Sequence, residues 1–328
     1  MTQPTLPPPA STPPAATAAA PSIEPDRPNA RPLLVATDHS ALGANAVAVA
    51  AALAAAGGQD VRVLHVVDTR AMPLPATVGM GVGLADALLG PDAHAEQERE
   101  VRAGIARALG REVDWPVRIT LGTPAAAITE EAERVHAALV VLGLQTHGRL
   151  ARLTQDETAI HVARAATRPV LAATAALRGV PSHVVAAVDF SRASLGAARA
   201  ALALLGGGGA LTLAYAPPLP LYNVEDGEHR VHELGVEAAF AWMEGELAAP
   251  PTVRIDRAVL RGQQPCPVAP LLLAHVEQAG ADLLALGSGR YGRVERMVLG
   301  SVTADVLRDG RVSVLSVPPD TAAPPAGA

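Results

Sequence analysis

Short, uninterrupted hydrophobic runs alternate along the chain with longer segments of helical character. The runs are rich in Val, Leu and Ala, and each is bounded by Gly, Pro or charged residues. Continuous apolar runs of this length are typical of strands buried on both faces, and the long segments between them predict crossover helices. The sequence therefore predicts an α/β fold with parallel sheets. The expected strands lie within residues 33–38, 61–68, 117–122, 137–143 and 168–174, and then 184–189, 210–217, 253–259, 281–287 and 311–317.

The second five runs repeat the first five in order. LLVATDHS at 33–40 and VVAAVDFS at 184–191 each end in Asp, one further residue and Ser, followed by a long Ala-rich helix. Ser40 and Ser191 are good helix N-caps, because the hydroxyl accepts from an unpaired N–H of the first turn. We expect these helices to stop at Gly57 and Gly206. VRVLHVVD at 61–68 aligns with ALTLAYAP at 210–217. A duplicated unit of this kind predicts two domains related by pseudo-symmetry.

Composition restricts the classes of function. The chain has 328 residues, of which 49% are hydrophobic, and a net charge of −6, so no overall field attracts nucleic acid or an anionic membrane. The single cysteine, Cys266, excludes an intramolecular disulfide and is expected to be a buried structural thiol. No apolar run reaches the roughly 20 residues that span a bilayer, and the start of the sequence lacks the features of a secretory signal. These observations favour a cytoplasmic protein.

The segment GSGRYGRVERMVLGS, residues 287–301, is a candidate phosphate site. Gly300 and Ser301 open a helix whose first turn also holds Thr303 and no carboxylate. A helix N-terminus presents unpaired N–H groups and a partial positive charge, and glycine allows close approach to the backbone. Three arginines, which match phosphate oxygens well, precede it at positions 290, 293 and 296. An ordinary glycine turn is the alternative, because the segment is neither a Walker motif nor a dinucleotide fingerprint.

The first half differs at the corresponding place. In GLQTHGRLARLTQDE, residues 143–157, Asp156 and Glu157 replace Gly300 and Ser301. Two carboxylates repel phosphate, and Thr154 to Glu157 has the spacing of a capping box, which satisfies the helix internally. We therefore expect the first half to have lost a site that the second half keeps. In open α/β sheets a ligand lies beyond the carboxyl ends of the strands, here near Asp189 and Gly287.

Four other features are weighed against plainer explanations. Asp38-His39-Ser40 holds the residue types of a catalytic triad, but adjacent residues cannot converge as one. A charged helix exterior explains the histidines at 229 and 232, with the glutamates at 225 and 228, better than a metal site does. The apolar residues at 240, 242 and 243 are expected to serve packing rather than to form a ligand box. Residues 69–90 form a long segment that suits a flap or a partner surface.

The motifs VATDHS and AAVDFS, LHVVD, LGTPAAAI and ALGSGRYGRVERMVLGSVTADVLR resemble, in order and spacing, the universal stress protein family in its tandem form. The resemblance covers about residues 32–318. It implies two five-stranded parallel-sheet domains of the HUP or Rossmann-like type, forming a pseudo-dimer whose halves join through the last strand of each. The implied boundaries are a disordered tail at 1–30, domains at 31–177 and 178–318, and a second tail at 319–328.

The ATP-binding branch of that family carries Gly, two residues, Gly, nine residues, then Gly and Ser or Thr. Gly287, Gly300 and Ser301 match, whereas Arg290 stands at the second glycine, where it either blocks the phosphates or binds them. The resemblance implies base and ribose contacts at Ala187, Val188 and Asp189, and a nucleotide passing over Leu286 and Gly287. Its phosphates would be held by residues 300–303, which are Gly300, Ser301, Val302 and Thr303. The motif is broken in the first half at Thr146, Asp156 and Glu157.

Three hypotheses follow. The first is a stress-response module that binds one ATP per chain in the second half, with Mg2+ as an accompanying ion, and acts through protein partners that the sequence does not identify. The second is a tandem scaffold that binds no nucleotide and acts by protein contacts; an additional homodimer contact stays open. The third is a slow ATP hydrolase, which ranks last because no general base is evident and no residue is assigned as catalytic.

Overall fold

The computed structural model describes residues 31–69, 91–145, 157–217, 226–261, 267–288 and 299–319. Strands and helices alternate through both halves, as the hydrophobic pattern predicts. In the first half the elements are β1 (Leu33–Thr37), α1 (Ala41–Gly57), β2 (Val61–Asp68), α3 (Pro91–Leu109), β3 (Val117–Gly122), α4 (Pro124–Arg134), β4 (Leu139–Gly143), α5 (Glu157–Ala165) and β5 (Val170–Ala173). In the second they are β6 (His183–Val188), α6 (Arg192–Leu204), β7 (Gly209–Tyr215), α7 (Asp226–Leu247), β8 (Val253–Val259), α8 (Val268–Ala279), β9 (Leu283–Gly287), α9 (Ser301–Asp309) and β10 (Ser313–Val317).

All ten of these strands form one sheet, in the order β3-β2-β1-β4-β5-β10-β9-β6-β7-β8. Within each half every neighbouring pair is parallel and the strand order is the same. The two halves meet where β5 pairs with β10, and this pair is antiparallel. The α/β fold with two tandem parallel-sheet units is thus confirmed, and so is the expectation that the last strand of each half forms the junction.

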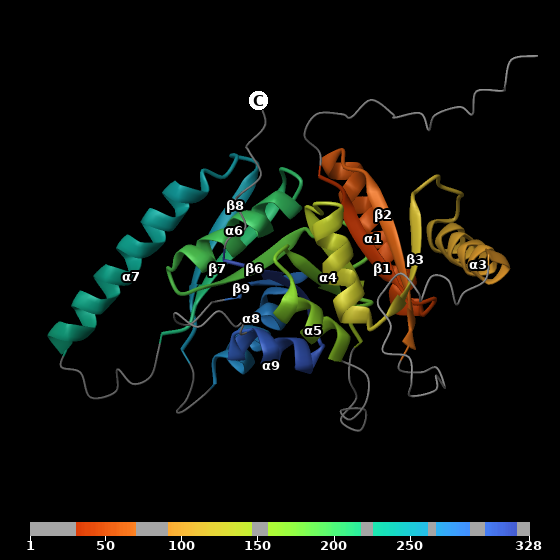
Figure 1. Ribbon diagram of the computed structural model, residues 1–328. Coiled ribbons are helices and arrows are strands. Elements are labelled where there is room, and N and C mark those ends of the chain that lie inside the picture. The colour runs from red at the N-terminus through yellow and green to blue at the C-terminus, as the bar shows by residue number, and fades with distance from the viewer. Residues whose placement is uncertain are drawn as a thin grey trace, which may run out of the picture. The chain divides into compact units, whose positions relative to one another are not determined.

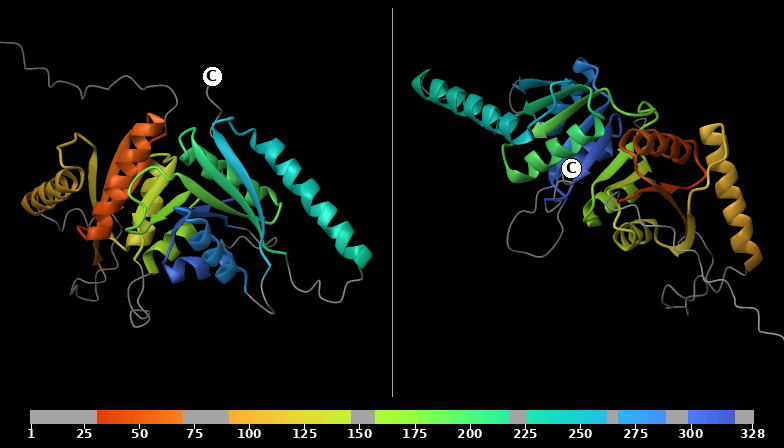
Figure 2. Two further views of the ribbon diagram at one scale, coloured as in Figure 1. Left: turned by 180° about the vertical axis from the view of Figure 1, so that it is seen from behind. Right: turned by 90° about the horizontal axis from the view of Figure 1, so that it is seen from above.

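Two layers of helices cover the sheet, and each encloses a hydrophobic core. One core combines α1, α3, α6 and α7 with one face of the strands, and its fully buried members include Val47, Ala198 and Phe240. The other combines α4, α5, α8 and α9 with the opposite face. Figures 1 and 2 show α3 beside the edge strand β3 and α7 beside the edge strand β8. Small Ala and Val side chains dominate both cores, which lets the helices approach the sheet closely.

Local signals place the helix starts well and the helix ends less well. Ser40 and Ser191 cap α1 and α6, accepting from the N–H groups of Gly43 and Ser194 at 3.0 and 3.2 Å. The stops differ from expectation, because Gly57 is the last residue of α1 and Gly58 takes the left-handed cap. In the second copy α6 already ends at Leu204, and the left-handed Gly206 follows one residue after the C-cap.

The strand register shifts the alignment of β2 with β7, which the sequence placed at residues 61–68 and 210–217, by one residue. Leu33 pairs with Val61, and Val184, its counterpart in β6, pairs with Leu211 rather than with Ala210. Side chains alternate between the two faces of a strand, so a shift by one residue would exchange the two faces. The register therefore makes His65 in β2 the counterpart of Tyr215 in β7, opposite Thr37 and Val188 respectively.

Candidate functional site

The candidate site of the second half begins at two adjacent strand ends. β6 and β9 are paired through Val184 with Leu283 and Ala186 with Ala285, so the residues that follow both strands leave the same edge of the sheet. Asp189 follows β6 directly, and Gly287 is the last residue of β9. The topology thus brings two of the sequence-predicted residues to neighbouring positions at the carboxyl edge. Ligands of open α/β sheets bind at this edge.

Asp189 is exposed and is held in place by the first turn of α6. The N–H of Ser191 donates to its Oδ1 at 3.0 Å, and its own N–H donates to Ser194 Oγ at 3.4 Å. Partial burial acts to raise the pKa of the Asp189 carboxyl, but hydrogen bonds from Ser191 and Ser194 outweigh it and the pKa lies below its usual value. Asp189 is consequently a fixed negative charge with free acceptor capacity at neutral pH.

An aromatic cluster lies directly beneath this turn. Phe190 adopts a left-handed backbone with φ of 61°, and its ring contacts Tyr215 and Phe240 at centroid distances of 4.9 and 5.1 Å. A left-handed phenylalanine is unusual, so the ring contacts compensate for local strain. Burial, together with the nearby charge of Asp189, raises the pKa of the Tyr215 hydroxyl. His39 has the same backbone conformation in the first half, with φ of 64°, and contacts His65 at 4.4 Å.

Packing requires glycine at position 287 and at its counterpart in the first half, whatever ligand binds. A Cβ at position 287 would lie 2.8 Å from the backbone C and O of Ala193 in α6. At Gly143, the counterpart in the first half, a Cβ would lie 2.8–2.9 Å from Leu42. The glycine therefore lets the first turn of the helix cross the end of the neighbouring strand. Because the first half needs it equally, Gly287 does not by itself indicate a nucleotide.

Gly300 differs from Gly287, because neither its backbone nor its contacts with the described residues demand glycine. It is the N-cap of α9 with φ of −55° and ψ of 144°, values that other residues adopt readily. Among the residues that the structure describes, a Cβ would meet only Thr303 Oγ1, at an ordinary 3.9 Å. No side chain caps α9, and its first turn contains no acidic residue. The start of α9 thus offers backbone N–H groups that no described side chain caps.

The remaining residues of the predicted phosphate site differ in exposure. Ser301 is exposed and Val302 half-buried, whereas the Thr303 side chain is only 2% exposed. The Thr303 hydroxyl is therefore enclosed, and of this residue only the backbone N–H is available at the helix start. Ala187 is half-buried, and Val188 and Leu286 are buried at 5% and 4% exposure, so these two can form only the base of such a site.

The first half begins the corresponding helix at the corresponding residue. α5 starts at Glu157 as α9 starts at Ser301, so an acidic residue occupies the first position of α5. Such a residue favours the helix and disfavours a bound anion. Asp38 accepts from the N–H and hydroxyl of Ser40 at 3.1 and 2.6 Å, which leaves it tied to the cap of α1.

Several predicted features lie outside the described residues. They are Thr146, Thr154, Asp156, Glu225, Cys266, Arg290, Arg293, Arg296 and most of the 69–90 segment. His229 and His232 belong to α7, but their side chains are not described. Among the side chains that the structure does describe, no group of three His, Cys, Asp or Glu residues is arranged to hold a metal ion. Within the same residues, no helix is both long and apolar enough to cross a membrane.

The sequence model of the universal stress protein family matches residues 29–173 and again residues 182–318. The chain belongs to the universal stress protein family. Both matches fall on complete five-strand units, so the tandem form inferred from the repeat is confirmed. A search of curated proteins found no match.

Solved structures of universal stress proteins share the fold over nearly the whole chain. A universal stress protein from Archaeoglobus fulgidus is 19% identical with a TM-score of 0.58, covering 88% of this chain and 99% of its own. A functionally unknown protein from Pseudomonas aeruginosa is 17% identical with a TM-score of 0.54, covering 89% and 93%. A putative universal stress protein from the same species is 16% identical with a TM-score of 0.54, covering 89% and 94%. At these identities the similarity establishes the fold alone.

Sequence reasoning missed Ser194 and Tyr215, both of which contribute to the surroundings of Asp189. Ser194 stands where the first half has Gly43, and comparison of the two copies could have identified that difference. Of the three apolar α7 residues expected to serve packing, Phe240 and Met243 are fully buried, whereas Trp242 is 45% exposed. Val236, Phe240, Met243 and Leu247 form the buried stripe of α7 at spacings of three and four residues, and Trp242 lies off this stripe.

Proposed function

We propose that this universal stress protein binds one ATP per chain in its second domain and acts through protein partners in a stress response. The proposed domains are residues 31–177 and 178–318, with the nucleotide at the carboxyl edge of the second and Mg2+ as an accompanying ion. The observation that carries the proposal is the start of α9 at Gly300, which no described side chain caps and where neither the backbone nor the described neighbours demand glycine. A bound phosphate would occupy the N–H groups of residues 301–303.

The asymmetry between the halves supports a single site. Glu157 at the first position of α5 places a negative charge where α9 offers Ser301. Asp189 supports recognition of the rest of the nucleotide, because a fixed carboxylate accepts from ribose hydroxyls. Val188 and Leu286 supply apolar surface below it. Arg290, which departs from the family pattern, supports the competing proposal of a scaffold that binds no nucleotide.

The test is a calorimetric titration of nucleotide-free protein with ATP in the presence of Mg2+. We expect about one ATP per chain. Gly300→Asp imports the charge that the first half carries at Asp156, and we expect it to weaken binding by about tenfold or more, since it opposes phosphate and fills the helix donors. Gly235→Asp makes the same change on the exposed face of α7, where a Cβ meets nothing within 4 Å, and should leave binding unchanged.

Other outcomes separate the alternatives. Two ATP molecules per chain would contradict the single-site proposal. No binding to the unmodified protein would favour the scaffold. Phosphate release well above background, abolished by one carboxylate substitution, would instead favour a slow hydrolase.

A further inference from the structure

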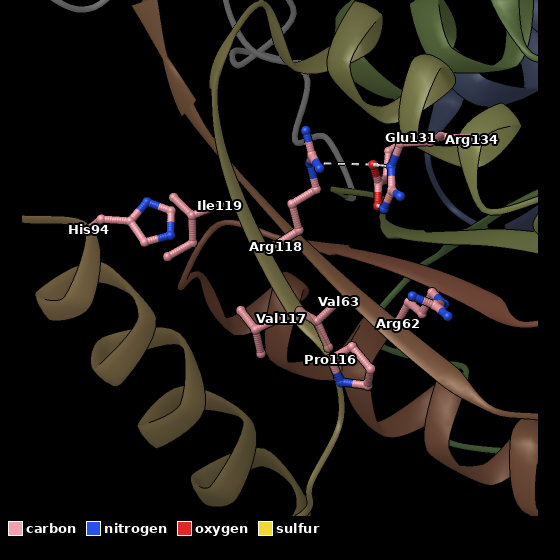
Figure 3. A pocket seen from close by; sticks show the side chains of 9 residues that line it. All are labelled: Arg62, Val63, His94, Pro116, Val117, Arg118, Ile119, Glu131 and Arg134. Carbon is pink, nitrogen blue, oxygen red and sulfur yellow. Dashed lines mark hydrogen bonds and ion pairs between the residues drawn. The ribbon is translucent and has the colours of Figure 1, made fainter. Parts of the chain in front are cut away.

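An open cavity of ≈ 380 Å³ lies in the first domain, around the start of the edge strand β3. β2, β3, α3 and α4 contribute its walls, so it is separate from the strand ends that form the proposed nucleotide site. Figure 3 shows Arg62, Arg118 and Arg134 on one side of β3 and His94 on the other. Three guanidinium groups around one cavity stand out in a protein whose net charge is −6.

One buried carboxylate organises two of these arginines. Glu131 in α4 is 5% exposed, and Arg134 donates to both of its oxygens at 2.6 and 2.7 Å. This hydrogen-bonded pair raises the pKa of the Arg134 guanidinium. Arg118 reaches the same carboxylate from β3 through its Nε, at 3.4 Å (Figure 3). Glu131 therefore holds Arg118 through its Nε and leaves the two terminal nitrogens of that guanidinium able to donate elsewhere.

Arg62 adds a cation that this carboxylate does not neutralise. It is exposed in β2, and no ion pair joins it to any other described residue. Counting Arg62, Arg118 and Arg134 against Glu131, the cavity carries three positive charges and one negative charge, a formal excess of +2. β3 is also an edge strand of the described sheet, so no described strand pairs with its outer backbone N–H groups. The excess charge and the free donors both suit a doubly charged oxyanion.

The second domain provides an internal comparison. Strand register places Thr212 where the first domain has Arg62, and Ala258 where it has Arg118. His275 precedes β9 by the same interval as Glu131 precedes β4, and Gln278 stands in place of Arg134. The fold therefore does not require these charges at this position. They belong to the first domain alone, the half that begins α5 with an acidic residue.

We propose that this cavity, which we call the Arg62–Arg118 cleft, binds a small phosphate monoester in its dianionic form. Arg62 and the free nitrogens of Arg118 donate to the phosphate oxygens, and Glu131 with Arg134 holds Arg118 in the required orientation. The volume accommodates a small metabolite rather than a macromolecule. Pro116 also lines the cavity and offers an apolar contact to the uncharged part of the ligand.

Trp115 makes this binding measurable. It lies next to Pro116, a residue of the cleft wall, and its carbonyl accepts from Arg102 at 3.4 Å. The chain has two tryptophans, so Trp242→Phe leaves Trp115 as the only indole. Glycerol 3-phosphate is the probe, with inorganic phosphate and succinate as companions, titrated into full-length protein. The titration is repeated in a Gly300→Asp background, so that a contribution from the proposed nucleotide site is separated from that of the cleft.

We expect saturable quenching or enhancement with glycerol 3-phosphate, unchanged by Gly300→Asp and weakened by added salt. Arg62→Ala and Arg118→Ala should each raise the dissociation constant about tenfold or more. Both side chains are exposed, so neither variant endangers folding. Arg254→Ala on β8 removes one exposed arginine from the opposite edge strand and should change the constant less than about twofold.

Three results would overturn the proposal. They are absence of saturable binding, binding that survives the double variant Arg62→Ala with Arg118→Ala, and tighter binding of succinate than of either phosphate. The first two results would mean that these arginines are ordinary solvent-exposed residues that bind no phosphate. The third would mean that the cleft selects carboxylates.

Discussion

Thr174 and Ser313 are hydrogen-bonded across the junction of the two halves. The N–H of Thr174, just after β5, donates to Oγ of Ser313, the first residue of β10, at 3.1 Å, and the two hydroxyl oxygens also lie 3.1 Å apart. Both residues are 1% exposed. The antiparallel pairing that joins the domains is thus supplemented by a polar contact in the interior, where a lost partner leaves a group without water.

Replacing Ser313 by Ala should lower the free energy of unfolding by about 1–3 kcal/mol, because the buried N–H of Thr174 loses its acceptor. Thr174→Val removes the hydroxyl but keeps that N–H, and should cost less. Chemical denaturation of both variants and of the double variant gives the coupling energy between the two side chains. A Ser313→Ala protein as stable as the unmodified one would show that the junction relies on apolar packing alone.

Gly287→Ala should destabilise the protein by about 1–3 kcal/mol, since the new Cβ would overlap the backbone of Ala193. Gly196→Ala is the matched control, because it lies in α6 and its Cβ would meet nothing within 4 Å. That variant should gain about 0.5–1 kcal/mol of helix stability. Urea denaturation of the two proteins measures both changes, and equal effects would refute the packing role assigned to Gly287.

Asp282→Asn should weaken the link between the starts of β6 and β9. Asp282 Oδ2 accepts from the N–H and hydroxyl of Ser182 at 2.7 and 2.8 Å and from the N–H of His183 at 3.0 Å. Partial burial alone would raise the pKa of the Asp282 carboxyl, but these bonds lower it. Because solvent screens the half-exposed group, we expect a loss of only about 1 kcal/mol at pH 7.

The pH dependence of this loss follows from the lowered pKa. The carboxylate contributes its stability above the unfolded value of about 3.9, and the contribution disappears as the pH falls through the folded value. The difference between the native protein and Asp282→Asn should therefore be constant from pH 7 to about pH 5 and shrink in more acidic solution. Asp256→Asn, which affects an exposed ion pair on β8, should show little difference at any pH.

His65 should make the protein less stable in mild acid. It is 7% exposed, and burial lowers its pKa, an effect that the proton on His39 would reinforce. The carbonyl of Thr37, 2.9 Å from Nδ1, and the carboxylates of Asp38 and Glu100 act in the opposite direction. Since the unfolded chain binds the proton more readily, the unfolding free energy falls as the pH drops below the usual histidine value of about 6.5.

His65→Tyr introduces the residue that the second half has at this position and removes the titration. Denaturation between pH 7.5 and pH 5 should show a flatter profile for this variant than for the unmodified protein. His161→Gln, a change at an exposed histidine of α5, should retain the original slope. If the His65→Tyr profile is as steep as the original, the pH sensitivity lies elsewhere.

The internal repeat and the short apolar runs were sufficient to predict the order of elements and the parallel sheet, because a buried strand is recognisable from its own Val and Leu residues. The meeting of the last strands of the two halves came only from the family resemblance, and the antiparallel direction of that pairing was not predicted. Gly287 shows that a sequence motif can also suggest a function for a residue that packing alone explains. The sequence assigned it to a nucleotide motif, and only the position of Ala193 reveals that close packing already requires a glycine there.

The chemistry of the sites was predicted less completely than the fold. Asp189 and Gly300 were proposed as site residues from the sequence, yet the burial of Thr303 depends on how α9 packs and has no local signal. The Arg62–Arg118 cleft was missed because Arg62, Arg118 and Glu131 lie on three different elements. Their proximity arises from strand register and helix packing, which a single sequence does not specify.

Because β5 and β10 of one chain form the antiparallel seam, the two halves can change in sequence independently, which the subunits of a symmetric dimer cannot do. When two identical chains pair, every substitution appears twice, so neither copy of a site can change without the other. Here one polypeptide supplies both strands, and their pairing does not depend on protein concentration. Each half can therefore accumulate its own substitutions while the other preserves the assembly, as the start of α5 with Glu157 and of α9 with Ser301 already shows.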